Sequence, residues 1–134
     1  VPEKTACLQN YDTTVYLMTD HRVSKAGFRE ALSCTAATVS VVTTDGSDGR
    51  AGLTVSSMCS VSDDPPSVLV CVNQASGVCD IIRNNGVICI NVLRVGHSSI
   101  ADGFSGRVAD SSRNPFDYAD WQTLVTGAPA MLQA

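Results

Sequence analysis

The sequence predicts a mainly β fold, a closed and mostly antiparallel β-barrel with short peripheral helices. Several β-branched or apolar runs of strand length follow one another, and short helical segments lie between them. The chain has no internal repeat and no regular strand–helix–strand alternation. A doubly wound parallel sheet requires that alternation, so the sequence disfavours this class.

Composition narrows the class of protein further. The 134 residues predict one domain, and 44% hydrophobic with 16% charged residues are typical of a packed chain. A net charge of -4 and only 5% aromatic residues argue against a nucleic-acid surface. The sequence has no apolar run as long as the ~20 residues that a membrane helix needs, and it has no signal-peptide pattern. We therefore expect a cytoplasmic protein that binds neither nucleic acid nor membranes.

The six cysteines lack CxxC spacing and lie mostly in apolar runs: Cys7, Cys34, Cys59, Cys71, Cys79 and Cys89. A disulfide scaffold is one interpretation, but buried free thiols fit these surroundings better. His21 and His97 lie far from any cysteine pair, so no zinc site is predicted.

The first half of the chain predicts an arm, a helix and three strands. Residues 1–23 show no period and are assigned to an N-terminal arm, with the domain covering residues 24–134. Ser24 is predicted to cap a short helix that covers an end of the barrel or sheet. Three strands follow, at Thr38–Thr44, Arg50–Ser62 and Ser67–Asn73, the last of them buried on both sides.

The second half alternates short helices with strands. The predicted elements are a helix around Val78–Ile82 ended by Asn84–Gly86, a strand at Val87–Leu93, a helix capped by Ser98 or Ser99 and ending at Phe104, a polar excursion at 107–117 and a strand from Trp121 to Val125. Asp63 and Asp64 precede two prolines, so we interpret them as turn formers and not as paired acid–base carboxylates.

The segment Arg50–Asn73 is the most informative part of the sequence. Its small and hydroxyl residues leave backbone N–H groups and short donors open to a flat, anionic ligand: Gly52, Thr54, Ser56, Ser57, Ser60 and Ser62. The alternative is that these residues lie on the solvent-exposed face of a structural hairpin that binds no ligand. Arg50 either neutralises a phosphate or solvates a turn, and we favour the turn. GxGxxG and GxxxxGK[ST] motifs are missing, so a nucleotide would bind without those phosphate cradles.

Several segments together resemble the short-chain NAD(P)H:flavin oxidoreductase family, the reductase components of two-component flavin monooxygenases. The resemblance covers about residues 26–132 and is carried by Phe28–Cys34, Val41–Gly46, Arg50–Ser57, Ser60–Asn73, Ile88–Leu93, Phe104–Gly106 and Trp121–Pro129. It implies a split β-barrel homodimer that binds FMN or FAD. It also implies that NADH or NADPH delivers hydride to flavin N5, and that reduced flavin then reaches a partner monooxygenase.

The same resemblance implies a set of flavin-binding residues and no catalytic side chain. Gly52, Leu53, Thr54 and Ser56 would line the isoalloxazine edge, while Ser57, Ser60, Val61 and Ser62 would lie nearer the ribityl chain and phosphate. Asn73 would also belong to the flavin-binding set. Ser76 would stand at a helix N-terminus that favours phosphate, a role compatible with plain capping. Phe104 would pack near the ring. The rival hypothesis is a non-catalytic flavin- or nucleotide-binding split-barrel module.

Members of this family continue beyond the segment that matches Thr126–Pro129. Further strands complete their barrel, and a Gly-x-His motif helps to seat the nicotinamide. Neither feature is found in this sequence, which ends at Ala134. We therefore expect a fragment, a truncated reading frame or an incomplete barrel with unpaired strand edges.

Overall fold

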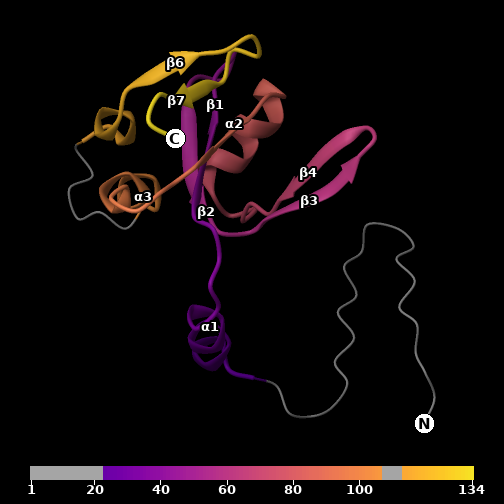
Figure 1. The fold of residues 1–134 in the computed structure, drawn as a ribbon, viewed down its shortest axis with the longest axis vertical. Helices are drawn as coiled ribbons and strands as arrows, with labels where there is room; N and C mark the ends of the chain where they lie inside the picture. Colours follow the sequence, from indigo (N-terminus) through magenta and orange to yellow (C-terminus); the bar gives the residue numbers. More distant parts are fainter. Residues whose placement is uncertain (1–22, 107–112) are drawn as a thin grey trace. The chain divides into compact units, whose positions relative to one another are not determined.

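The computed structural model describes residues 23–106 and 113–134. These residues contain seven strands, three α-helices and one 3-10 helix (Figure 1). They fall into two compact units divided after Ala36. The predicted arm lies outside the described residues except for Val23, and so do residues 107–112 of the polar excursion.

The first unit contains helix α1, Lys25–Ser33. Ser24 caps it as predicted, because its Oγ accepts a hydrogen bond of 3.0 Å from the backbone N–H of Gly27. The backbone carbonyl of Ser24 accepts the N–H of Phe28 at 2.9 Å. The expectation that this helix covers a barrel or sheet end stays a prediction.

The second unit is built on an antiparallel sheet of order β2-β1-β5. Its strands are β1 (Ser40–Thr44), β2 (Ala51–Val55) and β5 (Cys89–Val92). The central strand β1 is buried along its whole length, although two of its five residues are threonines and one is a serine. These hydroxyls need internal partners. Thr43 Oγ1 donates to the carbonyl of Pro129 at 2.5 Å, and Thr44 Oγ1 donates to that of Val87 at 2.7 Å.

A second antiparallel pair consists of β6 (Trp121–Thr123) and β7 (Pro129–Met131). Strand β7 is fully buried and contacts β1 and β5 of the sheet. The core beneath it consists of Val41, Ile100, Phe104 and Met131, with Trp121 and Phe116 packed against them. The rings meet edge to face, with centroids 4.9 Å apart for Phe104 and Phe116. Trp121, with which the predicted strand begins, is thus partly buried and packs against the core.

Two α-helices and a 3-10 helix complete the second unit: α2 (Gly77–Asn85), α3 (Ser98–Phe104) and η1 (Pro115–Tyr118). Helix α2 ends at Gly86, whose φ of 67° is left-handed and therefore suits glycine. The predicted cap of α3 was wrong. His97 occupies the cap position without a side-chain bond, and Ser98 is already the first helical residue.

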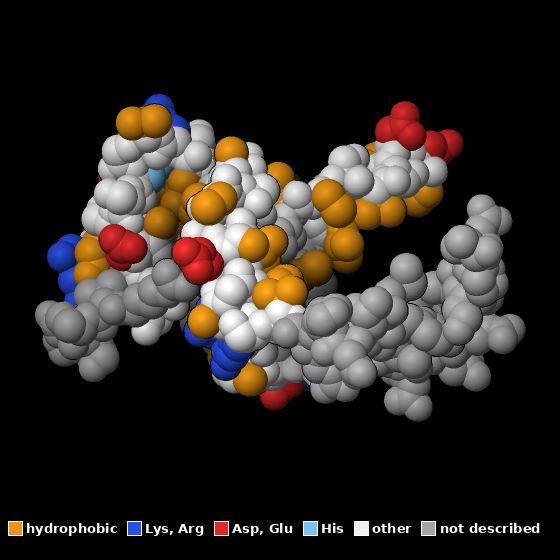
Figure 2. Space-filling view, turned by 90° about the horizontal axis from the view of Figure 1, so that it is seen from below, with side chains coloured by type: hydrophobic (Ala, Val, Ile, Leu, Met, Phe, Trp, Pro, Cys, Tyr) orange, Lys and Arg blue, Asp and Glu red, His pale blue; other side chains and the backbone are white. Residues whose placement is uncertain are grey.

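The hairpin of β3 (Met58–Asp63) and β4 (Pro66–Val70) projects from the sheet (Figure 1). Its apolar side chains are open to solvent, with exposed fractions of 63% for Val61, 58% for Val68 and 50% for Leu69. The predicted strand at residues 67–73 with two buried faces was therefore wrong. The predicted single strand at residues 50–62 is broken between β2 and β3. Figure 2 shows acidic side chains at the hairpin tip and hydrophobic ones along it.

The mainly β class with a few helices is confirmed. In the described residues, however, the strands form sheets of three, two and two strands, and a closed barrel is not seen. The five described cysteines are free, as predicted, but their predicted burial was wrong. Cys34, Cys59 and Cys71 are exposed, and Cys79 and Cys89 are partly exposed, because the apolar runs that hold several of them lie at the surface. Cys7 lies outside the described residues.

Candidate functional site at the base of the hairpin

The chain leaves β2 on one side of the base of the β3–β4 hairpin and leads into α2 from the other side. Ser57 Oγ donates a hydrogen bond of 3.0 Å to the carbonyl of Cys71, whose own N–H donates to the Ser57 carbonyl at 3.2 Å. This double contact closes the base of the hairpin, between Ser56, the residue after β2, and the Asn73–Ser76 turn that leads into α2. Ser57 is thereby placed next to Cys71, which lies two residues before Asn73, so predicted site residues stand on both sides of the hairpin base.

Strand β2 is an edge strand in the described part of the chain, since β1 is its one partner there. Backbone groups on its outer edge are left out of the ladder and face outward. One face of β2 is covered by α3, because Thr54 Oγ1 donates to the carbonyl of Ala101 at 2.6 Å. A Cβ placed on Gly52 would lie 2.8 Å from Phe104 Cε1. Leu53 points to the other face and is partly exposed.

The turn before α2 is held by its own hydrogen bonds. Asn73 Oδ1 accepts the N–H of Ala75 at 2.9 Å, and the Asn73 carbonyl accepts the N–H of Ser76 at 2.9 Å. Ser76 caps the helix, with Oγ accepting the N–H of Val78 at 3.4 Å. The predicted cap is confirmed. The N-terminus of this helix carries a partial positive charge and favours an anion close to Ser76 and Gly77.

The other predicted residues lie away from this base. Ser60, Val61 and Ser62 lie along the projecting hairpin, and the Ser62 hydroxyl is bonded to the backbone of Asp64 at 2.9 and 3.1 Å. Phe104 is only 5% exposed and packs in the core. Its place beside a flavin ring, like the roles of the hairpin residues, stays a prediction.

Arg50 is held at the turn between β1 and β2. Its Nε lies 2.8 Å from Asp45 Oδ2, and its guanidinium carbon lies 5.5 Å from the centroid of the Phe116 ring. These contacts explain its position without a phosphate, in agreement with the turn interpretation.

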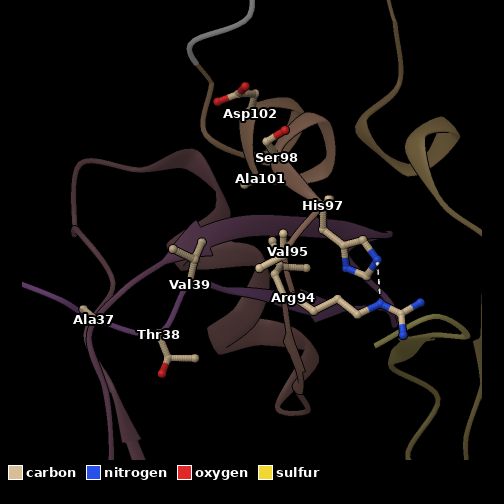
Figure 3. Close-up of a pocket in the computed structure, with 11 residues that line it drawn as sticks. Ala37, Thr38, Val39, Arg94, Val95, His97, Ser98, Ala101 and Asp102 are labelled. Carbon is tan, nitrogen blue, oxygen red and sulfur yellow. Dashed lines mark hydrogen bonds between the residues drawn. The ribbon is translucent and has the colours of Figure 1, made fainter.

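A separate cavity of about 530 Å³ lies between the start of β1 and the segment that joins β5 to α3 (Figure 3). Arg94 Nε donates to His97 Nε2 at 3.3 Å on one side, and Asp102 lies on the opposite side. His97 Nδ1 is buried without a partner among the described residues. Valine and alanine side chains line the space between these groups. The sequence did not predict this cavity, because the polar and apolar residues that line it follow no recognisable spacing along the chain.

The described residues contain no cluster of three or more potential metal ligands. Within the same residues, no helix is both long and apolar enough to span a bilayer. Burial raises the pKa of the Cys89 thiol, which lies in β5 on the far side of β1 from β2. The candidate site at the base of the β3–β4 hairpin is made of serine hydroxyls, backbone groups and the N-terminus of α2.

Comparison with known proteins identifies relatives of this chain. The model of the flavin reductase like domain matches residues 32–134. The FMN reductase (NADH) RutF of Bradyrhizobium diazoefficiens strain USDA 110 is 46% identical over 109 residues, which cover 81% of this chain. The same alignment covers 59% of the relative, so the chain spans about three fifths of its length.

Solved structures show the same likeness. The NADH:FAD oxidoreductase SgcE6 of Streptomyces globisporus C-1027, in complex with NAD and FAD fragments, is 30% identical with a TM-score of 0.70. The match covers 82% of this chain and 64% of SgcE6. BorF, the flavin reductase component of a bacterial two-component tryptophan halogenase, is 29% identical with a TM-score of 0.69, over 81% of this chain and 68% of BorF. The chain therefore belongs to the flavin reductase like domain family.

Proposed function

We propose that this chain is the flavin-binding domain of an NADH-dependent flavin reductase. The observation that carries the proposal is the placement of an open strand edge, β2, and a capped helix N-terminus, α2, on the two sides of one hairpin base, which Ser57 and Cys71 close. A flat ring with hydrogen-bonding edges suits the first feature, and a phosphate suits the second. FMN and FAD combine both groups in one molecule.

The residues at this base fit a flavin. The outward backbone groups of Leu53–Val55, followed by Ser56 and Ser57, would hold the isoalloxazine edge and the ribityl chain. Ser76 and the first N–H groups of α2 would hold the phosphate. The serine side chains are short, so a ligand can approach the main chain closely. Preformed caps and turns also reduce the ordering cost of binding.

The flavin, when bound, supplies the redox chemistry, with N5 as acceptor of hydride from NADH or NADPH. The protein's task is to orient the ring, expose one of its faces to the nicotinamide and stabilise negative charge at the ring edge through fixed backbone N–H donors. These roles do not require a pair of acid and base side chains. Asp63 and Asp64 lie at the exposed tip of the hairpin, away from its base.

We further propose a partner enzyme, a split β-barrel and a homodimer. Reduced flavin would pass to a second enzyme, a partner monooxygenase; BorF likewise serves a second enzyme, a tryptophan halogenase. The three antiparallel sheets would be parts of a split β-barrel. A second copy of the chain would cover exposed apolar side chains in a homodimer, since Val61, Val68 and Leu69 are all exposed on the projecting hairpin.

Anaerobic mixing of the protein with FMN and NADH tests this function. The expected result is saturable flavin binding followed by loss of the oxidised flavin absorbance band when NADH is added. Binding without loss of that band would favour the non-catalytic flavin-binding module. A chain that binds no flavin in the presence or absence of NADH would overturn the proposal.

A further inference from the structure

Asn85, the last residue of α2, joins this helix to the turn between β1 and β2. Its Nδ2 donates to the carbonyl of Gly49 at 2.9 Å and to Thr44 Oγ1 at 3.2 Å. Its Oδ1 accepts the backbone N–H of Asp48 at 3.0 Å. Both donor hydrogens of the carboxamide and one acceptor position are therefore used in contacts with this turn and with the end of β1.

The turn is shaped to receive this side chain. A Cβ added to Gly46 would lie 2.7 Å from Asn85 Oδ1, so the turn backbone packs directly against the carboxamide. The neighbouring Asn84 adds a bond from Nδ2 to Asp48 Oδ2 at 2.5 Å. Thr44, which receives one of the Asn85 bonds, is buried in the central strand. The end of α2 is thus anchored both to the turn and to the core sheet.

The same helix carries Ser76 at its other end. A helix of nine residues is about 13 Å long and rigid over that distance. Helix α2 contacts β1 and β2, and its larger apolar residues Val78, Ile81 and Ile82 are only partly buried. Apolar contacts of this kind are non-directional and leave the tilt of a helix weakly defined. The directional hydrogen bonds of Asn85 define it.

Asp48 and Gly49 lie in the turn that leads into β2, the strand whose open edge forms the other half of the candidate site. One side chain therefore links both halves at the end remote from the ligand. The geometry points to Asn85 as a positioning residue that holds the phosphate-binding N-terminus of α2 at a fixed place relative to β2. This inference rests on the proposed function, and it assigns Asn85 no contact with the flavin.

Comparison of FMN with riboflavin, which lacks the phosphate, tests the inference in the full chain. For Asn85→Ala we expect the Kd of FMN to rise about tenfold and that of riboflavin to stay within about twofold. Asn85→Asp keeps the acceptor for the Asp48 N–H but loses both donors, and should give a smaller change of the same kind. Asn114→Ala is the matched control, because Asn114 caps the remote helix η1.

Gly46→Ala supplies a second route if Asn85→Ala does not fold. The added methyl would displace the carboxamide and should also weaken FMN more than riboflavin. Equal weakening of both ligands, or no change in either, would overturn the positioning role. A wild-type chain that binds neither flavin would instead overturn the proposed function, and the inference with it.

Discussion

Asn91 in β5 accepts a hydrogen bond of 2.7 Å from the backbone N–H of Met131 in β7. Its Nδ2 donates to the carbonyl of Val41 and to Thr43 Oγ1, both at 3.1 Å. The side chain is only 3% exposed, so these bonds form in the core. A single carboxamide thereby joins the β2-β1-β5 sheet to the β6–β7 pair.

Replacement of Asn91 by leucine should lower the free energy of unfolding by about 3 kcal/mol, because the buried N–H of Met131 loses its acceptor. Urea denaturation measures the change. Asn114→Ala, which removes an exposed cap, should cost only about 1 kcal/mol. A loss below about 1 kcal/mol for Asn91→Leu would show that the network contributes little.

The sequence predicted the strand that contains Asn91 but not the role of this residue. Alternation of side chains indicates which positions face inward, whereas the partner Met131 lies forty residues further along the chain. The same limit applies to Asn85, whose partners lie about forty positions earlier in the chain. Such contacts depend on tertiary packing and leave no local signal.

Replacement of Gly52 by alanine should destabilise the chain by about 1–3 kcal/mol, because the new Cβ would meet the Phe104 ring and the Val42 carbonyl. Thermal or urea unfolding measures this cost. In a Phe104→Leu background the cost should shrink, since the smaller side chain leaves room. Additive effects of the two substitutions would contradict the contact.

Replacement of Ser76 by aspartate separates helix capping from phosphate binding. Aspartate caps helices about as well as serine, so the free energy of unfolding should stay within about 0.5 kcal/mol of wild type. Its negative charge would repel the phosphate, and the Kd of FMN should rise at least about tenfold, while that of riboflavin changes little. Fluorescence titration measures both constants. Unchanged FMN affinity would remove Ser76 from the phosphate site.

The partly buried thiol of Cys89 should make the folded chain less stable at alkaline pH. Burial raises the pKa of its thiol, so the folded chain keeps this proton where the unfolded chain has begun to release it. The free energy of unfolding should therefore fall as the pH rises above about 8.5, and this group should have no effect below that range. Cys89→Ala should reduce the slope, and the exposed Cys59→Ala should not. Equal slopes in both variants would contradict the assignment.

Local signals in the sequence proved reliable where the chemistry is local. The caps at Ser24 and Ser76 and the helix end at Gly86 depend on neighbouring residues, and all three are found in the structure. Burial of Ser67–Asn73 was predicted wrongly, because a continuous apolar run does not reveal whether another layer covers it. The position of Phe104 in the core likewise depends on Phe116 and Trp121, which are distant in sequence.

Hydrogen–deuterium exchange with and without FMN tests the central claim, that flavin binds at the base of the β3–β4 hairpin. We expect slower exchange in two segments, Leu53–Ser57 and Asn73–Cys79, with little change around the separate cavity lined by residues 93–98. Riboflavin should protect the first segment and leave the second nearly unchanged, because it lacks the phosphate. Protection confined to residues 93–102, or no protection by FMN anywhere in the chain, would contradict the account.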